Sequence, residues 1–189
     1  MDIKTLTATL SVTPQITASD MQAIKDAGFR AIICNRPDGE GADQPTFAEI
    51  EKAAKKVGIE ASYQPIVSGQ VSDEDATAFD AACANLPGPV LAYCRTGTRS
   101  ATLWSLSQAK TRSVADIFAA TKAAGYDMGG VVRRIVNGGK TPTDTGDAQY
   151  DIVIVGAGAG GIAAAASLKS RKPGLEIAII DPADIHYYQ

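Results

Sequence analysis

Apolar and polar positions along the first 137 residues predict strands that alternate with helices. Four segments are apolar or β-branched, as is typical of strands: residues 5–12, 29–35, 59–67 and 90–93. Capping residues and helical spacing predict helices at residues 17–27, 46–57, 72–85, 99–110, 114–124 and 130–136. This alternation predicts an α/β fold with a parallel sheet flanked by helices, in which ligands bind at the carboxyl ends of the strands.

The pattern changes after residue 137. Residues 138–149 are rich in Gly, Thr, Asp and Pro without an apolar period, which is typical of a linker. Residues 150–155 then read as a strand, an alanine-rich helix follows, and residues 176–180 read as a second strand. We therefore expect a first domain over residues 1–137, a linker over 138–149, and a truncated Rossmann-type βαβ segment over 150–189.

A glycine motif opens the alanine-rich helix of this last segment. Gly156, Gly158 and Gly161 fit the G-x-G-x-x-G pattern, and Asp181 lies twenty residues past the last of them, where an acid binds a ribose hydroxyl. The motif predicts an FAD- or NAD-binding unit. Because a βαβ unit of about 40 residues buries too little surface to fold or hold FAD alone, FAD is expected only in a full-length fusion, of which this chain is a fragment.

Composition and charge narrow the class of protein. The chain is 45% apolar and 21% charged, and no apolar run approaches the roughly 18 residues of a membrane helix. No signal peptide is evident, so a soluble cytoplasmic protein is expected. The net charge of −3, without a basic stripe, argues against nucleic acid as a partner.

The cysteines and the histidine are too few and too scattered for a zinc site. The chain has three cysteines and one histidine: Cys34, Cys83, Cys94 and His186. This set suits free thiols in a reducing compartment, argues against a metal site, and leaves the first domain without a Cys–His pair. Cys34 and Cys83 read as core residues.

Cys94 is the candidate nucleophile, because it directly follows the apolar strand at residues 90–93. The backbone N–H groups of residues 95–98 are expected to form an anion nest at the start of the next helix, with Gly97 supplying a conformation that other residues resist. Such surroundings favour a thiolate without a histidine base. The anion-binding loop therefore comprises Arg95, Thr96, Gly97 and Thr98.

Other side chains near the loop are candidates for anion binding. The Arg99 guanidinium can hold two oxygens or a charged sulfur group in fixed geometry. Ser100 or Thr98 could donate a hydroxyl hydrogen bond to the thiolate. For Arg95 and Arg36, a positive rim that attracts anions and a solvated surface charge are equal alternatives.

Four residues separate Cys94 from Arg99. Cysteine-dependent phosphatases carry five at this place, and CRTGTR resembles the tighter loop of rhodanese-type sulfurtransferases. The whole stretch 1–137, including FRAIICNRPDGEG, GPVLAYCRTGTRSATLW and AGYDMGGVV, resembles a family with a dual-specificity-phosphatase-like fold. Its members include phosphatase-like domains and sulfur transferases, fused to β-lactamase-like hydrolases or flavoproteins. The ending DPADIHYYQ resembles the beginning of sulfide:quinone oxidoreductases.

Phosphatases of this fold place an aspartate on the loop upstream of the cysteine strand, as a general acid. Here Ser68, Gly69 and Gln70 occupy that loop, and Asp73 reads as part of a helix start. Asp38 is the one carboxylate that could serve instead, although a role in a turn fits it better. A missing acid costs about 10²- to 10⁴-fold in rate, which favours sulfur transfer over phosphoryl transfer.

These observations predict a sulfurtransferase. Cys94 would take sulfane sulfur from thiosulfate or a glutathione persulfide, with Arg99 stabilising the anion, and pass it to a thiol, sulfite or cyanide. No cofactor is expected in this domain, and a fused or associated flavoprotein that oxidises sulfide is the expected partner. Two alternatives stay open: a cysteine-dependent protein tyrosine or dual-specificity-like phosphatase, and a non-catalytic persulfide sensor.

Overall fold

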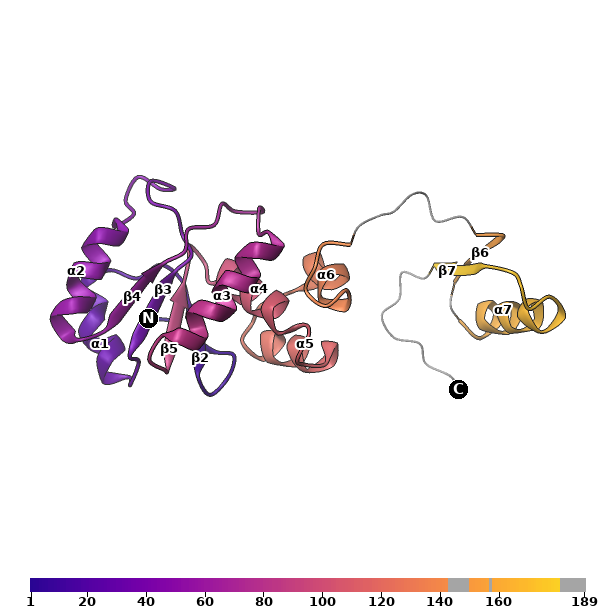
Figure 1. The fold of residues 1–189 in the computed structure, drawn as a ribbon, viewed down its shortest axis with the longest axis horizontal. Coiled ribbons are helices and arrows are strands. Elements are labelled where there is room, and N and C mark those ends of the chain that lie inside the picture. Colours follow the sequence, from indigo (N-terminus) through magenta and orange to yellow (C-terminus); the bar gives the residue numbers. More distant parts are fainter. Residues whose placement is uncertain (143–149, 157, 181–189) are drawn as a thin grey trace. The chain divides into compact units, whose positions relative to one another are not determined.

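The computed structural model describes residues 1–142, 150–156 and 158–180 (Figure 1). By its internal contacts the chain divides into two compact units, Met1–Pro142 and Thr143–Gln189. Across the described ranges, every helix is too short or too polar to cross a membrane.

The first unit is built on a five-stranded sheet in the order β1-β2-β5-β3-β4. Its strands are β1 (Lys4–Thr5), β2 (Leu10–Thr13), β3 (Ala31–Cys34), β4 (Glu60–Tyr63) and β5 (Val90–Tyr93). Four of them run parallel, whereas β1 pairs antiparallel with β2. The predicted α/β class is confirmed, with the correction that the sheet is mixed.

The antiparallel edge arises because the predicted strand 5–12 is interrupted by a turn. The amides of Leu6 and Thr7 both donate to the carbonyl of Leu10, at 3.1 and 3.0 Å. The Thr7 hydroxyl accepts from the amides of Thr9 and Leu10, at 3.2 and 3.0 Å. A threonine side chain that bonds nearby backbone competes with a strand ladder, so the segment folds back into two strands.

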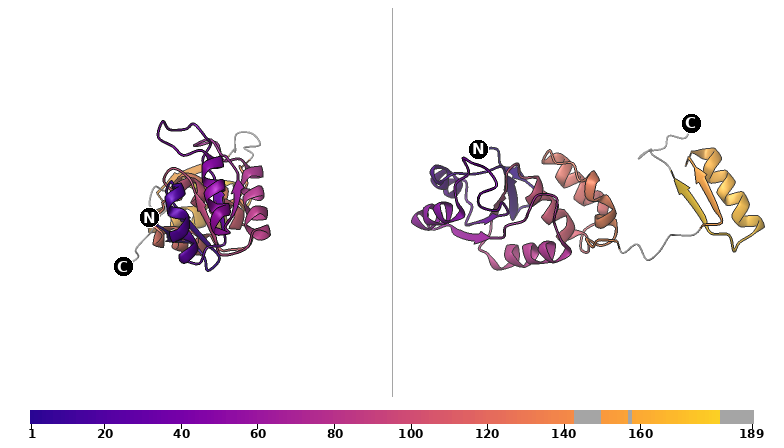
Figure 2. Two further views of the ribbon diagram at one scale, coloured as in Figure 1. Left: turned by 90° about the vertical axis from the view of Figure 1, so that its left-hand side faces the viewer. Right: turned by 90° about the horizontal axis from the view of Figure 1, so that it is seen from above.

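Helices cover both faces of the sheet (Figures 1 and 2). On one side lie the 3₁₀ turn Ala18–Asp20 with α1 (Met21–Asp26), and α2 (Phe47–Val57). On the other lie α3 (Asp73–Asn85), α4 (Thr98–Gln108), α5 (Val114–Ala123), and the 3₁₀ turn Gly129–Val131 with α6 (Val132–Val136). Capping boxes at Thr46 and Ser72 start α2 and α3, where they satisfy amides that have no partner within the helix.

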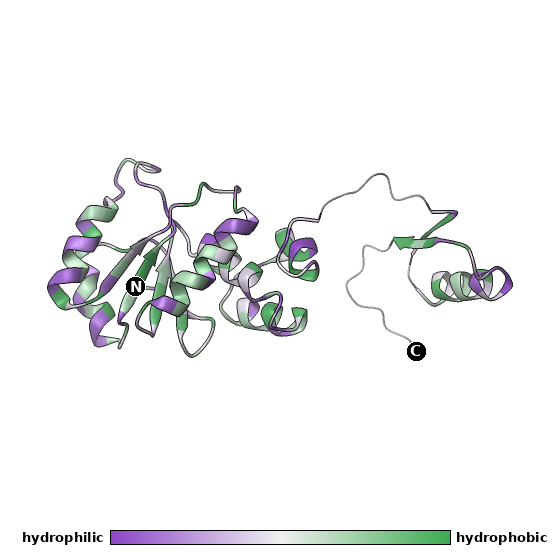
Figure 3. Cartoon of the chain, in the orientation of Figure 1, coloured by the Kyte–Doolittle hydropathy of each residue, from purple (hydrophilic) through white to green (hydrophobic). Residues whose placement is uncertain are grey.

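Two apolar cores lie on the two faces of the sheet, and the strands between them are mostly apolar (Figure 3). In β3, Ile33 packs into the core under α3 and α4, whereas Ile32 and Cys34 pack into the core under α1 and α2. Cys83 is half-buried against the first core. Because β3 and β5 are buried on both faces, their carboxyl ends form a rigid platform for whatever follows them.

The second unit contains β6 (Ile152–Val155), α7 (Ala159–Arg171) and β7 (Ile177–Ile180), with the two strands parallel. Gly156 has a φ of 104°, and a Cβ atom at Gly161 would lie 1.8 Å from the Gly156 carbonyl oxygen. Glycine is therefore required at both positions for the strand and the helix to approach this closely. The predicted ribose-binding Asp181 lies outside the described residues.

Candidate functional site

A pocket of about 440 Å³ opens at the carboxyl end of β5. Its walls come from the loop after β4, the Cys94 loop, α4, and the start of α6. The lining residues are Ser68, Gly69, Val71, Cys94, Arg95, Thr96, Thr98, Arg99, Thr102, Val131 and Arg134. The predicted anion-binding loop therefore forms one wall of a pocket at the carboxyl edge of the sheet, where ligands of α/β proteins bind.

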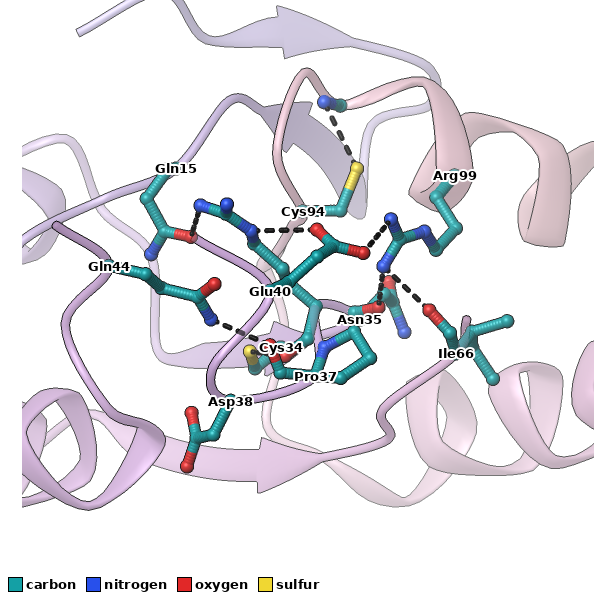
Figure 4. A network of polar contacts seen from close by, with 12 residues as sticks. Gln15, Cys34, Asn35, Pro37, Asp38, Glu40, Gln44, Ile66, Cys94 and Arg99 are labelled. Carbon is teal, nitrogen blue, oxygen red and sulfur yellow. Dashed lines mark hydrogen bonds and ion pairs between the residues drawn. The ribbon is translucent and has the colours of Figure 1, made fainter. Parts of the chain in front are cut away.

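Cys94 lies at the base of a loop that turns directly into α4. The Gly97 amide donates to Cys94 Sγ at 3.2 Å, as Figure 4 shows. Gly97 is the N-cap residue of α4, with a φ of 88° and no side-chain cap. The first amides of a helix have no partner within it, so the start of α4 presents N–H donors and the positive end of the helix dipole beside the sulfur.

Tyr126 packs against the outside of this loop. Its hydroxyl donates to the Thr96 carbonyl oxygen at 3.4 Å. A Cβ atom at Gly97 would lie 2.0 Å from the Tyr126 hydroxyl oxygen. Burial, and then the neighbouring Cys94, raise the pKa of Tyr126, which keeps its hydroxyl protonated as a donor. Tyr126 thus restrains the loop and makes glycine obligatory at position 97.

Arg99 is the second residue of α4 and points inward (Figure 4). Its Nη1 donates to the carbonyl oxygens of Asn35 and Ile66 at 3.0 and 2.6 Å, and its Nη2 donates to Glu40 Oε1 at 2.8 Å. Only 8% of Arg99 is exposed. The arginine therefore ties the ends of β3 and β4 to α4 while its side chain still lines the pocket.

Glu40 also pairs with a second arginine. Arg36 Nε donates to Glu40 Oε2 at 2.9 Å, and Arg36 Nη1 donates to Gln15 Oε1 at 2.9 Å. Burial opposes ionisation of Glu40, but the hydrogen bonds and charges of Arg36 and Arg99 outweigh it and hold its pKa below the usual range. Glu40 is consequently a carboxylate at neutral pH and cannot serve as a proton donor.

The predicted arginine rim is only partly present. Arg36 is 7% exposed, paired with Glu40, and absent from the pocket wall, so neither a rim nor a solvated charge describes it. Arg95 is exposed and lines the pocket. The positive wall therefore comes from Arg95, Arg99 and Arg134.

The predicted hydroxyl donors bond elsewhere. Ser100 Oγ donates to Asn35 Oδ1 at 2.8 Å, and both residues are fully buried. Thr96 Oγ1 donates to Thr98 Oγ1 at 3.1 Å. Ser100 thus supports the residue that receives Arg99, and the donor to Cys94 Sγ is the Gly97 amide.

The candidate acids do not face Cys94. Asp38 Oδ1 accepts from the Phe47 amide at 2.8 Å, and in Figure 4 the carboxylate points away from Cys94. Asp73 is held by Arg134 at 2.7 Å and by Thr141. Among the described residues that line the pocket, none is a carboxylate. Asp38 therefore binds the first amide of α2, and its carboxylate does not serve the pocket.

The sequence patterns did not predict that four further residues lie in this region: Asn35, Glu40, Tyr126 and Arg134. Asn35 and Glu40 could have been predicted, because both follow β3. The carboxyl ends of neighbouring parallel strands meet at one edge of the sheet, where the site lies. Tyr126 and Arg134 come from segments after α5, whose return to the pocket no local pattern predicts.

Comparison with known proteins connects this geometry to a family. Residues 2–111 match the family model described as "Beta-lactamase hydrolase-like protein, phosphatase-like domain". A beta-lactamase hydrolase-like protein of Agrobacterium fabrum is 32% identical over 121 residues, which cover 63% of this chain and 28% of that protein. The chain thus matches less than a third of the length of this curated relative.

Solved structures agree with the family match. A "putative phosphatase" from Neisseria meningitidis has a TM-score of 0.67 and 35% identity, covering 73% of this chain and 99% of that chain. A "putative phosphatase" from Shewanella putrefaciens has a TM-score of 0.59 and 17% identity, over 73% of this chain and 90% of that one. The second likeness concerns the fold alone, and both confirm the predicted phosphatase-like architecture.

These matches overturn the predicted sulfurtransferase activity, since the family and the solved relative are phosphatase-like rather than rhodanese-like. They likewise give no support to the rhodanese, flavoprotein and oxidoreductase identities expected from the loop and the tail. The prediction was wrong because it took the four residues between Cys94 and Arg99 as the width of a ring that Arg99 closes around the anion. Arg99 instead lies within α4 and reaches inward to Asn35 and Glu40, so the distance in sequence from Cys94 to Arg99 does not measure the width of the loop.

Proposed function

The chain belongs to the family of the beta-lactamase hydrolase-like protein, phosphatase-like domain, and from this premise we propose that it is a cysteine-dependent phosphatase. In the proposed reaction Cys94 is the nucleophile toward phosphate monoesters. The backbone amides of the loop Arg95–Thr98 bind the phosphoryl oxygens, and Arg99 lines the pocket while it ties the start of α4 to the ends of β3 and β4.

One observation carries this proposal: the Gly97 amide donates to Cys94 Sγ at 3.2 Å where the chain enters α4, on the wall of a 440 Å³ pocket. An amide donor and a helix N-terminus beside a sulfur stabilise its anion. The same donors match the oxygens of a phosphoryl group. The arrangement therefore places a hydrogen-bond donor on the nucleophilic sulfur and a cradle of donors around its target.

The chemistry proceeds in two displacements. The Cys94 thiolate attacks phosphorus, so that a P–S bond forms, the ester P–O bond breaks, and the leaving oxygen departs with the electron pair of that bond. Water then attacks the phosphocysteine, which forms a new P–O bond, breaks the P–S bond, and releases phosphate with regeneration of the thiolate. The loop amides at the start of α4 bind the phosphoryl oxygens in both steps, and the positive charge of Arg99 in the pocket wall favours them.

The residues of the pocket wall also determine how the leaving oxygen receives a proton. No carboxylate lines the pocket among the described residues, and the two arginines keep Glu40 ionised. Without a positioned acid, the leaving oxygen takes its proton from water, which forfeits about 10²- to 10⁴-fold for poor leaving groups. The proposed enzyme therefore favours phosphates of acidic alcohols, such as phenols, over phosphates of alkyl alcohols.

The test is phosphate release from p-nitrophenyl phosphate by the full chain and by Cys94→Ser. We expect turnover by the unaltered protein, a fall of at least about 10³-fold in Cys94→Ser, and a phosphoryl mass gain on the Cys94 peptide after acid quench. Cys83→Ser, which alters a half-buried thiol away from the pocket, is the matched control and should retain its rate. Equal rates in Cys94→Ser and the unaltered protein would refute the assignment, as would the absence of phosphate release.

A further inference from the structure

We propose that Arg134 and Arg95 form a second anion site beside Cys94, so that the preferred substrate is a small organic molecule with two phosphoryl groups. This inference rests on the proposed phosphatase function and concerns the same pocket. One phosphoryl group would lie at Cys94 and the other between Arg134 and Arg95.

The size of the pocket exceeds what a single phosphoryl group needs. Its volume of about 440 Å³ falls within the range of about 300–1,000 Å³ that sites for small organic ligands occupy. Val71 and Val131 contribute apolar surface to the same wall as the arginines. The pocket thus has space and apolar contact for a carbon frame in addition to the group under attack.

Charge in the pocket is of one sign. Three separate segments supply its arginines: Arg95 from the Cys94 loop, Arg99 from α4 and Arg134 from α6. Arg99 is engaged with Glu40, whereas the exposed Arg95 side chain pairs with none of the residues that the structure describes. Cations that converge on a cleft concentrate the potential within it, which favours a ligand with more than one negative group.

Arg134 is held in a fixed orientation. Its Nη1 donates to the Val71 carbonyl oxygen at 2.6 Å and its Nη2 donates to Asp73 Oδ1 at 2.7 Å. Asp73 is fixed in turn by the amide and hydroxyl of Thr141. Burial opposes ionisation of Asp73, but Thr141 and Arg134 outweigh it and keep its pKa low, so the ion pair persists at neutral pH.

One nitrogen of the Arg134 guanidinium has no acceptor among the described residues. This nitrogen, Nε, is buried. A buried donor without a partner costs free energy, and such a group in a native protein calls for an explanation. The Arg134 side chain lines the pocket with its guanidinium fixed on two sides, so it is pre-organised for an anion, since little side-chain entropy remains to be lost on binding.

The test measures binding separately from turnover, in the Cys94→Ser chain, by calorimetric titration. The probes are inorganic phosphate and 1,3-phenylene bisphosphate, which carries two phosphoryl groups on a phenolic frame. We expect the bisphosphate to bind at least about 10-fold more tightly than phosphate, and Arg134→Gln and Arg95→Gln each to reduce this ratio at least about 3-fold. Arg112→Gln, which alters an arginine over the Trp104 ring away from the pocket, should leave the ratio unchanged.

Two further variants separate binding from folding. Asp73→Asn removes the ion pair but keeps the guanidinium and its bond to the Val71 carbonyl oxygen, so the bisphosphate should still bind more tightly than phosphate if Arg134 contacts the ligand. If Arg134 is only a structural anchor, this preference should be lost in Asp73→Asn as it is in Arg134→Gln. Should Arg134→Gln fail to fold, Arg95→Gln on the exposed loop decides the question. A ratio near one in the Cys94→Ser chain overturns the proposal, as does an unchanged ratio in both arginine variants. If the protein releases phosphate but binds the bisphosphate no more tightly than phosphate, the second anion site is wrong and the proposed phosphatase function stands. If it binds the bisphosphate more tightly but releases no phosphate, the proposed phosphatase function is wrong and the second anion site stands.

Discussion

Glu40 accepts a hydrogen bond from Arg99 at 2.8 Å, although the two residues lie 59 positions apart in the sequence. The contact joins the loop after β3 to α4. A carboxylate at this place balances the charge of a buried arginine and also fixes where its guanidinium lies. The loop after β3 is therefore part of the site, even though it contributes no residue to the pocket wall.

Replacing Glu40 with glutamine should destabilise the fold in a pH-dependent way. The folded-state pKa of Glu40 is lowered by Arg36 and Arg99, so its stabilisation is present above the unfolded-state pKa of about 4.3 and is lost as the pH falls through the folded-state pKa. We expect Glu40→Gln to lower the free energy of unfolding by about 1–3 kcal/mol at pH 7, and the difference from the unaltered protein to shrink below about pH 4. Urea denaturation at pH 7 and at pH 3.5 measures both values.

Glu51→Gln is the matched control for this prediction, because Glu51 is an exposed carboxylate on the neighbouring helix α2. Its effect on the free energy of unfolding should stay within about 0.5 kcal/mol at pH 7. A Glu40→Gln protein as stable as Glu51→Gln at pH 7 would show that the arginine pair does not depend on the carboxylate.

Gly97→Ala should damage the Cys94 loop for two separate reasons. Alanine resists the φ of 88°, at a cost of about 1–2 kcal/mol, and its Cβ would meet the Tyr126 hydroxyl at 2.0 Å. We expect lower stability than the backbone term alone predicts and a loss of phosphatase rate of about 10²-fold, because the amide that bonds Cys94 moves. Thermal unfolding and p-nitrophenyl phosphate hydrolysis measure the two effects.

Gly58→Ala separates these two causes. Gly58 has a φ of 78° at the end of α2, and a Cβ atom there would have no neighbour within 4 Å. This variant should show the backbone cost of about 1–2 kcal/mol with full activity. Equal stability losses in the two alanine variants would mean that Tyr126 moves aside at no cost, against the restraint that we assign to it.

Apolar runs and capping residues predict much of the fold of the first unit, because each of these patterns lies within a single helix or strand. The strand predicted at residues 90–93 is found residue for residue as β5, and the helix predicted from residue 46 begins with the capping box of Thr46 and Glu49. The predicted strand 5–12 failed where the Thr7 hydroxyl bonds nearby backbone, which no apolar alternation reveals.

The sequence predicts only part of the candidate site. The position of Cys94 follows from the rule that ligands bind at the carboxyl ends of parallel strands. The partners of Arg99 do not, because Glu40 reaches it through a loop whose path depends on tertiary contacts. Arg134 comes from α6, more than thirty residues beyond the loop, and its place on the pocket wall depends on how α5 and α6 pack.

Ser100→Ala should cost more than an ordinary serine truncation. Ser100 Oγ donates to Asn35 Oδ1 at 2.8 Å in a fully buried setting, so its removal leaves an amide oxygen without that donor. We expect a loss of about 1–3 kcal/mol in the free energy of unfolding. Ser105→Ala on the same helix is the control, because Ser105 bonds the Ala101 carbonyl oxygen, which the helix ladder already satisfies. Similar unfolding midpoints for the two variants in urea would contradict the role given to Asn35.

Iodoacetamide at pH 8 should label Cys94 before the other two cysteines. Burial raises the pKa of the Cys34 thiol, and burial raises the pKa of Cys83 to about 12, so both stay protonated and unreactive. Cys94 lines the pocket beside the Gly97 amide, whereas neither Cys34 nor Cys83 does, so a small alkylating reagent that enters the pocket meets Cys94 Sγ. Peptide mass spectrometry should find one rapidly modified cysteine, absent in Cys94→Ser, and inorganic phosphate should slow its labelling because it occupies the same donors. Labelling of Cys34 or Cys83 at a comparable rate, or no protection by phosphate, would contradict the anion site proposed around Cys94.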